Sequence, residues 1–597
     1  MKRRALALLL ALFLIVLAAA CGNGSDQETE TETPVGGDAE QTPEPRPVFQ
    51  TTVEDEEVED NFEVQVIVGE VDEFNAGRGE HMLIVYSPMR GETTQTNPYG
   101  YEAVVENGRV VSLGGNNNTI PQNGVVVSGN GGAERWMKEH ILPGSAIATS
   151  REDYSITVTN DKQAYMNAAK QVYRDVKDTL EEFREHNTIA AEADTRMAGI
   201  EALFAELRAA RTGEAVIESY EAIKSESAES LNFVVPSFAE ETRAIWVISK
   251  NESRERVRRN MERYAEAGFN TVMLDVFSHG YVIYPDSEYV RQRPDSKNGF
   301  DLLQEYIDLG KELGIDIHAW TTTFFVGEPS FRYDDNRSGS PIIDDHPDWV
   351  SMRRDGTAYA GIHEDGFIWL SQTNPDVQEF LLGMYNEIIE RYDVKGINLD
   401  YIRTSVGSDH ADLSMGFEPS AVEAFKAESG IDITTITDVH SEEWAQFSAW
   451  RAGHITDLVH RIKANMERVT AETGKELYLS ACTVDDWEHA IRGKSQNWKA
   501  WLEDGVLDFI CPMAYLPNPE GVANVVYSMV NGFPGSLNVT GLNFNMGNEQ
   551  ITRQIMAARR AGAVGVCFFF SDHLNPRRIA LLNEGVFRTP ATPVYTR

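Results

Sequence analysis

Carboxylate, amide and aromatic side chains recur in this chain just past the ends of short apolar runs. The run GINL (396–399) leads into Asp400, Tyr401 and Arg403, and a second run at 476–483 leads into Asp485 and Asp486. Carboxyl groups can hold or release a proton during bond cleavage, whereas aromatic rings can stack on the C–H face of a sugar ring. The pattern therefore points to acid–base chemistry on a hydroxyl-rich ligand.

The full set is large enough to surround such a ligand. The residues at or after the run ends are Asp275, His318, Trp320, Asn398, Asp400, Tyr401, Arg403, Asp485, Asp486, Trp487, Met513, Tyr515, Asn543, Asn545, Asp572 and His573. Cleavage of a glycosidic bond needs two carboxyl groups, one protonated to assist the leaving oxygen and one ionised to attack or to activate water. Asn, Asp, Arg and His supply paired donors and acceptors for sugar hydroxyls.

Asp400 is the first catalytic candidate. It follows an apolar strand-like run and stands near Arg403, and an Asp at the mouth of a buried strand is costly without a partner or a purpose. The alternative is that Asp400 and Arg403 form a structural ion pair.

Asp275 and Asp485 are the other catalytic candidates. Asp275 could equally hold a neighbouring loop through hydrogen bonds. Asp485 stands next to Asp486, and adjacent like charges can raise the pKa of one carboxyl group; a solvated loop is the alternative.

The remaining candidates are expected to contact substrate. They are His318, Trp320, Asn398, Arg403, Trp487, Tyr515, Asn543 and Asp572. His318 has the alternative of a buried core histidine, and Trp320 and Tyr515 have the alternative of packing in the core. No metal-ligand spacing is visible in the sequence, and the predicted chemistry needs no cofactor.

The region that positions these residues alternates amphipathic helices with short apolar strands. The eight strand candidates are 243–248, 271–277, 316–324, 396–402, 476–483, 508–515, 538–544 and 565–571. Eight such units predict a (β/α)8 barrel over residues 241–597, with the site at the carboxyl ends of the strands. A doubly wound open sheet is the alternative, but its Gly-rich nucleotide turn does not follow the first strand, which leads into SKNESRER.

The chain before residue 241 divides into segments with different sequence patterns. Residues 61–160 contain β-rich runs between Gly and Asn turns and predict a small β domain. Residues 161–240 repeat apolar positions at three and four residues and predict a helical hairpin. Residues 22–60 are acidic and rich in Gly, Pro and Thr, which is typical of a disordered tether.

The N-terminus resembles a bacterial lipoprotein signal. Lys2, Arg3 and Arg4 precede an apolar run at 5–17, and three Ala lead into Cys21. This pattern predicts an exported protein anchored in a membrane by lipid on Cys21, with residues 1–21 as the signal segment; a plain secretory signal is the alternative. The formal charge of −40 argues against a nucleic-acid partner.

Several segments taken together resemble a known family. They include AGFNTVMLDVF, YDVKGINLDYIRT, NWKAWLEDGVLDFICPMAY and AGAVGVCFFF, in this order. The region from about 240 to 590 is similar to bacterial glycosyl-hydrolase-like family 10 proteins, and the stretch near residues 99–137 looks like a small β domain that precedes such barrels. The resemblance implies a barrel-type carbohydrate-active enzyme, some of whose relatives are similar to peptidoglycan glycan hydrolases, with its strand-four acid at Asp400 and its strand-six aromatic at Tyr515. Where many relatives have Gln and Arg in strand two, this chain has Asp275 and Phe277.

Three functional hypotheses follow. The first is an exported glycoside hydrolase acting on peptidoglycan glycan or another polysaccharide. The second is a surface lipoprotein that binds carbohydrate without cleaving it, because a fold alone licenses no activity. The third is a scaffold in which the β domain and the helical hairpin carry the function.

Overall fold

The computed structural model describes most of the chain. The described residues are 51–52, 58–79, 81–96, 100–182, 190–330, 333, 338–361, 364–405, 407 and 410–596. Cys21 and the predicted signal segment lie outside them, as does the predicted tether apart from 51–52 and 58–60. The chain divides into two compact units at Pro236 and Ser237. No helix among the described residues is long and apolar enough to span a membrane.

The first unit contains a nine-stranded sheet. Its strands are β1 (Thr51–Thr52), β2 (Glu63–Glu70), β3 (Glu73–Phe74), β4 (Leu83–Tyr86), β5 (Tyr101–Glu106), β6 (Arg109–Leu113), β7 (Gly124–Gly129), β8 (Ala146–Ser150) and β9 (Ser155–Asp161). The main order is β2-β9-β8-β6-β5-β7-β4-β3, with β1 paired to β6. Asn107 and Gly108 have φ of 50° and 77° and form the tight turn between β5 and β6, as Asn-Gly does in two-residue hairpins. Helix α2 (Gly132–His140) follows β7.

Three helices complete this unit. They are α3 (Lys162–Glu182), α4 (Ala190–Ala209) and α5 (Gly213–Val234). Their apolar positions form one core that includes Met166, Ile200 and Ile223. The buried Lys162 ammonium donates to the carbonyls of Arg208 and Ala210, so the start of α3 is fastened to the end of α4.

The second unit is built on eight parallel strands. They are β10 (Thr242–Val247), β11 (Thr271–Ser278), β13 (Asp316–Thr322), β16 (Gly396–Asp400), β17 (Tyr478–Thr483), β18 (Phe509–Pro512), β19 (Val539–Asn543) and β20 (Gly565–Phe569). Neighbours pair in parallel from β18 through β10 to β20 and β19. Parallel bridges from Ile510 to Asn538 and from Met513 to Gly541 join β18 to β19. The predicted (β/α)8 barrel is confirmed.

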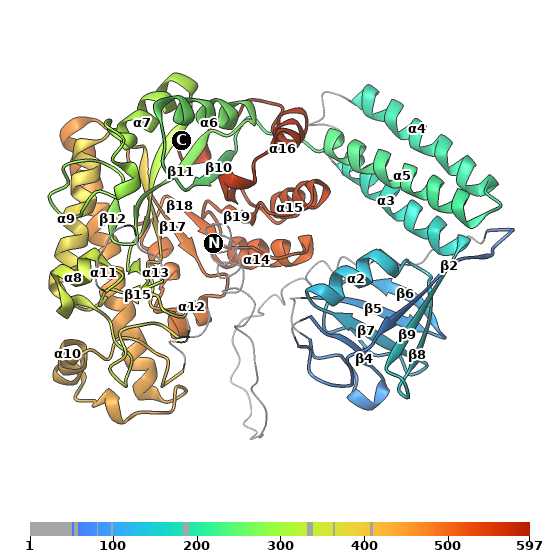
Figure 1. Ribbon diagram of the computed structural model, residues 1–597, viewed down its shortest axis with the longest axis horizontal. Coiled ribbons are helices and arrows are strands. Elements are labelled where there is room, and N and C mark those ends of the chain that lie inside the picture. Colours follow the sequence, from blue (N-terminus) through green and yellow to red (C-terminus); the bar gives the residue numbers. More distant parts are fainter. Residues whose placement is uncertain are drawn as a thin grey trace, which may run out of the picture. The chain divides into compact units, whose positions relative to one another are not determined.

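Helices lie outside these strands (Figure 1). They are α6 (Arg254–Glu266), α7 (Leu302–Leu313), α9 (Pro375–Arg391), α11 (Glu442–Thr473), α12 (Trp487–Lys494), α13 (Trp498–Glu503), α14 (Pro519–Gly532), α15 (Asn548–Arg560) and α16 (Pro576–Leu581). Side chains of Ser253, Asp301 and Ser441 cap three of their N-termini, satisfying backbone N–H groups that have no partner inside the helix.

Two long insertions interrupt the simple alternation. Residues 323–374 separate β13 from α9 and contain the hairpin β14 (Phe325–Gly327) and β15 (Ile368–Trp369), together with α8 (Pro341–Asp345). Residues 401–441 separate β16 from α11 and contain α10 (Pro419–Ser429). Both insertions follow strand ends, so they extend the end of the barrel where a site is expected.

Side chains fill the barrel interior. Ala244, Trp246, Met273, Trp320, Cys482, Phe509, Cys511, Val539, Cys567 and Tyr595 belong to one buried cluster. Tyr595 comes from beyond the last strand, and its ring stacks on Phe509 with centroids 4.9 Å apart. The barrel interior is therefore a packed core, as is usual for this fold.

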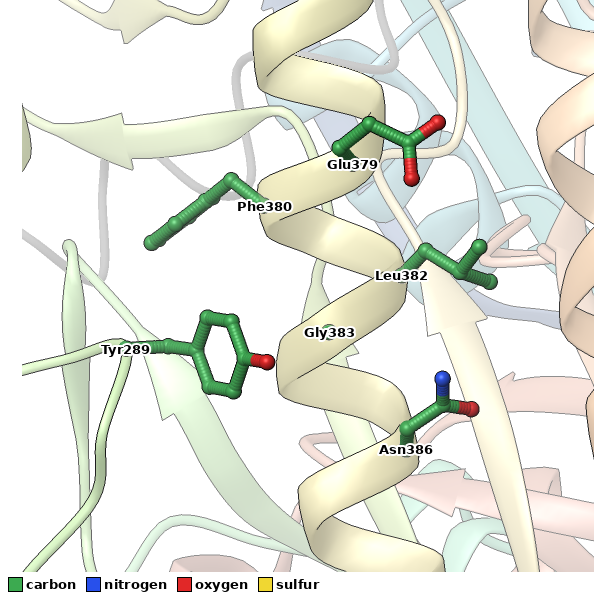
Figure 2. Close-up of a pocket in the computed structure, with 6 residues that line it drawn as sticks. All are labelled: Tyr289, Glu379, Phe380, Leu382, Gly383 and Asn386. Carbon is green, nitrogen blue, oxygen red and sulfur yellow. The ribbon is translucent and has the colours of Figure 1, made fainter.

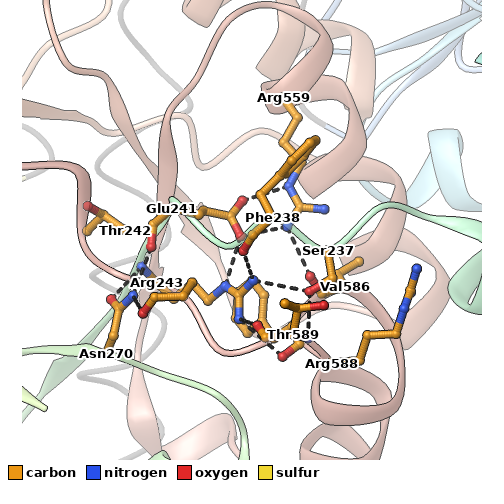
Figure 3. A network of polar contacts seen from close by, with 12 residues as sticks. Ser237, Phe238, Glu241, Thr242, Arg243, Asn270, Arg559, Val586, Arg588 and Thr589 are labelled. Atoms are coloured by element: carbon orange, nitrogen blue, oxygen red, sulfur yellow. Dashed lines mark hydrogen bonds and ion pairs between the residues drawn. The ribbon is translucent and has the colours of Figure 1, made fainter. Parts of the chain in front are cut away.

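A buried guanidinium ties the first strand to the chain beyond the last one (Figure 3). Arg243 is fully buried, and its Nε lies 2.9 Å from Glu241 Oε2. Its Nη1 donates to the carbonyls of Phe587 and Thr589 at 3.1 and 2.7 Å. Arg559 from α15 pairs with the same Glu241 at 2.7 Å.

We expect Arg243→Ala to lower the free energy of unfolding of the barrel by about 3–5 kcal/mol, because it leaves buried carbonyls and a carboxylate short of a donor. Urea unfolding followed by tryptophan fluorescence measures this, since nine of the ten tryptophans lie in the barrel unit. The control is Arg258→Ala, which removes an exposed pair with Glu312 and should cost less than about 1 kcal/mol. Equal costs for the two variants would contradict a special role for Arg243.

Candidate active site

Asp400 ends β16 and lies at the mouth of the barrel. The residue is 9% exposed. Its Oδ2 accepts a hydrogen bond from the indole Nε1 of Trp320 at 3.1 Å, and its Oδ1 accepts one from the backbone N–H of Tyr401 at 2.8 Å. Tyr401 has a φ of 49°, a left-handed conformation that is uncommon for a residue with a side chain. The chain thus turns sharply straight after the carboxyl group.

Burial raises the pKa of Asp400 above its ordinary value. The hydrogen bond from the Tyr401 backbone and the charge of Arg403 act against this rise, whereas the charge of Glu364 adds to it. A carboxyl group with a raised pKa keeps its proton to higher pH, which is the requirement for a general acid.

Arg403 pairs with a residue that the sequence pattern did not indicate. Its Nη2 lies 2.9 Å from Glu364 Oε1, and the two side chains are 7% and 0% exposed. The guanidinium also lies over the rings of Tyr401 and Trp369, at 4.8 and 5.3 Å. The direct partner of Arg403 is therefore Glu364, and Arg403 acts on Asp400 through its charge. Glu364 belongs to the insertion 323–374 and does not directly follow a strand of the barrel, so no spacing signal could have identified it.

Four aromatic rings gather beside Asp400. The ring of Trp246 lies 6.5 Å from Trp320, 6.5 Å from Tyr515 and 6.2 Å from Phe569, and Tyr515 and Phe569 are 5.6 Å apart. Trp320, Trp246 and Phe569 come from three different strands, and Tyr515 follows β18. Tyr515 is half-buried, so part of this aromatic cluster faces solvent and can meet a sugar face.

Asn398 supports this cluster from within the barrel. It is fully buried; its Oδ1 accepts from Trp246 Nε1 at 3.2 Å, and its Nδ2 donates to Ser480 Oγ at 2.9 Å. The structure therefore gives Asn398 a positioning role behind the aromatic rings and no access to substrate.

Asp275 is engaged in a buried ion pair. Its Oδ2 lies 2.9 Å from Arg293 Nη1, with side chains 4% and 1% exposed. Burial raises the pKa of Asp275, and Arg293 opposes the rise. Arg293 also contacts Ser249 Oγ and Asp295. This geometry favours the alternative interpretation, in which Asp275 fastens the loop around Arg293 to β11.

The residues after β17 form a more open part of the site. Asp485 is half-buried, accepts the backbone N–H of Asp486 at 3.1 Å, and has its pKa raised by burial. Asp486 caps α12 by accepting from the His489 backbone. Trp487 is 41% exposed, with the Lys499 ammonium 4.7 Å from its ring centroid. Asp485 is therefore a second carboxyl group with a raised pKa that solvent can reach.

Asn543 and Asp572 lie at or after the ends of the neighbouring strands β19 and β20. Asn543 is half-buried, and its Oδ1 accepts the backbone N–H of Asn545 at 2.8 Å. Asp572 is exposed in a short 3-10 turn at Ser571–His573. Neither is in contact with Asp400 through a hydrogen bond that the structure describes.

His318 lies deeper in the barrel, two residues before Trp320 on the same strand. It is fully buried, with ring centroids 5.0 Å from Tyr595 and 5.8 Å from Phe509. Neither ring nitrogen has a hydrogen-bond partner among the described residues, and burial lowers the pKa of His318 to about 3. This position corresponds to the core histidine and gives no support for contact with substrate.

The candidate site thus combines Asp400 and its partners with an open rim. Asp400, Trp320, Arg403 and Tyr515 lie close together, Asn398 supports them, and Asp485 and Trp487 stand on the next loop. Among the described residues there is no group of three or more His, Cys, Asp or Glu side chains that could hold a metal ion. Such an arrangement can donate a proton and present an aromatic face to a hydroxyl-rich ligand.

Comparison with known proteins finds a family whose model matches most of the barrel. Residues 241–528 match the glycosyl hydrolase-like 10 family, which confirms the resemblance seen in the sequence. A protein of Escherichia coli (strain K12) named glycosyl hydrolase DigH is 23% identical over 306 residues, covering 46% of this chain and 62% of that protein. An S-layer-related protein of Niallia circulans is 26% identical over 265 residues, covering 39% of this chain and 16% of that protein. The chain thus spans less than two thirds of these relatives.

Solved structures are similar at lower identity. The catalytic domain of β-amylase from Paenibacillus polymyxa is 14% identical with a TM-score of 0.43, and the match covers 57% of this chain and 95% of that one. A β-galactosidase from Marinomonas ef1 is 11% identical with a TM-score of 0.42, covering 57% and 58%.

The burial of His318 predicts a specific acid sensitivity. Its folded-state pKa is lowered, so its contribution to stability is complete above about pH 6.5 and is lost progressively as the pH falls towards about 3, at about 1.4 kcal/mol per pH unit. In His318→Leu, the stability lost between pH 7 and pH 4.5 should be smaller than in the wild type by up to about 2.5 kcal/mol. Urea unfolding at the two pH values measures this difference.

His440→Leu, at an exposed histidine, is the control and should leave the pH dependence unchanged. An unaltered acid sensitivity in His318→Leu would show that His318 accepts a proton in the folded chain.

Proposed function

We propose that this chain, whose barrel matches the glycosyl hydrolase-like 10 family, is a lipid-anchored glycoside hydrolase outside the cytoplasm that cleaves cell-wall glycan or another polysaccharide. The observation that carries the proposal is the Asp400 carboxyl group. It is almost buried, its pKa is raised, and it lies beside aromatic rings at the end of the barrel where such enzymes place their chemistry.

In this proposal Asp400 is the general acid. Its proton passes to the glycosidic oxygen as the bond from that oxygen to the anomeric carbon breaks, and water supplies the hydroxyl group that the anomeric carbon gains. The half-buried ring of Tyr515 binds a sugar face, the buried Trp320 holds the Asp400 carboxyl group through its indole N–H, and Arg403 tunes the proton affinity of Asp400. Asp485 is the second carboxyl group, because it is open to solvent and β17 pairs directly with β16.

The proposed location outside the cytoplasm is supported by the N-terminal sequence. Basic residues, an apolar run and small residues before Cys21 support export and lipidation of that thiol. The names of the two relatives, a glycosyl hydrolase and an S-layer-related protein, support a glycan substrate at the cell surface. Peptidoglycan glycan is therefore the first substrate to test.

One observation favours the non-catalytic alternative. Glu364, the carboxylate whose charge acts on Asp400, is fully buried and neutralised by Arg403. It is therefore unable to attack an anomeric carbon in this arrangement, and a two-carboxylate mechanism depends on Asp485. A protein that bound glycan without releasing products would fit the same aromatic surface.

We expect Asp400→Asn to lower the hydrolysis rate by about a hundredfold or more, because the amide has no proton to donate. The fold should survive, with a stability change within about 1.5 kcal/mol, because the amide has the same size and only one buried acceptor is lost. The assay incubates the full chain with peptidoglycan, glycan strands stripped of peptide and a polysaccharide panel, and identifies products by mass spectrometry.

Asp457→Asn, at an exposed position on α11, should keep full activity. Products that persist in Asp400→Asn would remove Asp400 from the chemistry, and binding without products in the wild type would establish the non-catalytic alternative.

The pH profile tests the electrostatic roles of Arg403 and Glu364. The acid form of Asp400 is required, so activity should fall as the pH rises through its raised pKa. Arg403 lowers that pKa and Glu364 raises it. Arg403→Gln should therefore shift the alkaline limb of the pH–rate profile to higher pH, and Glu364→Gln should shift it to lower pH, each by about one pH unit. If the pair is purely structural, both substitutions should lower the activity at every pH and leave the alkaline limb at the pH of the wild type. The profiles of kcat/KM against pH, recorded with melting temperatures, distinguish these cases.

A further inference from the structure

A hollow on the outer side of the barrel has the features of a second ligand site. It lies over α9, has a volume of about 500 Å³ and is lined by Tyr289, Glu379, Phe380, Leu382, Gly383 and Asn386. Figure 2 shows the two aromatic rings on one side of the helix and Glu379, Leu382 and Asn386 on the other, with Gly383 between them. Its size is within the range of about 300–1,000 Å³ that is usual for ligand pockets.

The aromatic side of this hollow is held in place by a glycine. A Cβ at Gly383 would lie 2.3 Å from Cε1 of Tyr289, so only glycine lets the tyrosine ring approach the helix this closely. Phe380 meets the same ring edge-on with centroids 6.3 Å apart. Tyr289 nevertheless remains 42% exposed. A large aromatic ring is thus fixed in orientation while much of its surface faces solvent, as a stacking platform requires.

The opposite side offers hydrogen-bond acceptors. The Oδ1 atom of Asn386 is buried and has no hydrogen-bond partner among the described residues, which is costly unless a ligand or water satisfies it. The Glu379 carboxylate is held by Arg461 from α11. Acceptors of this kind match the hydroxyl groups of a sugar, and none of the six lining residues is a cation that would favour an acidic sugar.

We infer that this hollow binds an uncharged sugar unit of a polysaccharide, as a second glycan site apart from the barrel mouth. The choice of ligand rests on the proposed function. Helix α9 leads into β16, and in this fold the helices run antiparallel to the strands, so its first turns lie towards the end of the barrel that holds Asp400. A long glycan held at the hollow is thereby kept near the mouth at a raised effective concentration.

The test is affinity electrophoresis of the intact chain in gels that contain glycol chitin, hydroxyethyl cellulose or amylopectin, with polygalacturonate as the acidic comparison. We expect at least one uncharged polymer to retard the wild type, and Tyr289→Ala to weaken that binding about tenfold, equivalent to about 1.4 kcal/mol. Gly383→Ala should have the same effect by displacing the ring, although alanine favours a helix. Tyr154→Ala removes a tyrosine of similar exposure, 48%, and should bind as the wild type does.

Hydrolysis of a short soluble oligosaccharide is measured in parallel and should be equal in all four proteins. Loss of retardation in Tyr289→Ala and Gly383→Ala with unchanged hydrolysis supports the site, and the same loss in a chain that hydrolyses nothing supports the site while rejecting the proposed function. Retardation that both variants keep, retardation by none of the uncharged polymers, or stronger retardation by polygalacturonate would overturn the inference.

Discussion

Closure of the barrel between β10 and β20 is the constraint on which the rest of the second unit depends. Thr242 pairs with Gly565 across 323 residues of chain, and the buried Arg243 guanidinium joins Glu241 to the carbonyls of Phe587 and Thr589. Only a closed barrel brings the ends of β13, β16 and β18 to one mouth, and only a mouth of that kind gathers Trp320, Asp400 and Tyr515 in one place.

The same closure sets the electrostatics of the candidate site. Packed side chains below the mouth exclude water, and this exclusion raises the pKa of Asp400. The Arg403–Glu364 pair is buried in the same surroundings, so its two charges act on Asp400 with little screening. The proton affinity of one carboxyl group is therefore adjusted by an ion pair whose members come from two separate insertions, 323–374 and 401–441.

The sequence allowed the barrel to be predicted because each strand is a short apolar run between amphipathic helices, a local pattern that repeats eight times. The position of Asp400 beside Trp320 followed from the rule that strand ends meet at one mouth; its catalytic role stays a prediction. Glu364 was missed because its insertion has no periodic pattern, and its contact with Arg403 exists only in three dimensions. His318 was placed with the rim because alternation along a strand predicts which side chains point inward but not how deep in the barrel each one lies.

The number of residues between β10 and β20 also sets how long β10 waits during synthesis before its partner strand exists. At about 5–20 residues per second, synthesis of the 323 residues from Arg243 to Gly565 takes about 15 to 65 s. Throughout that interval the apolar strand TRAIWV has one edge without its partner, and such edges pair readily with other chains. The nascent chain therefore needs protection by a chaperone, or transient cover from its own later helices, for far longer than a helix or a hairpin takes to form.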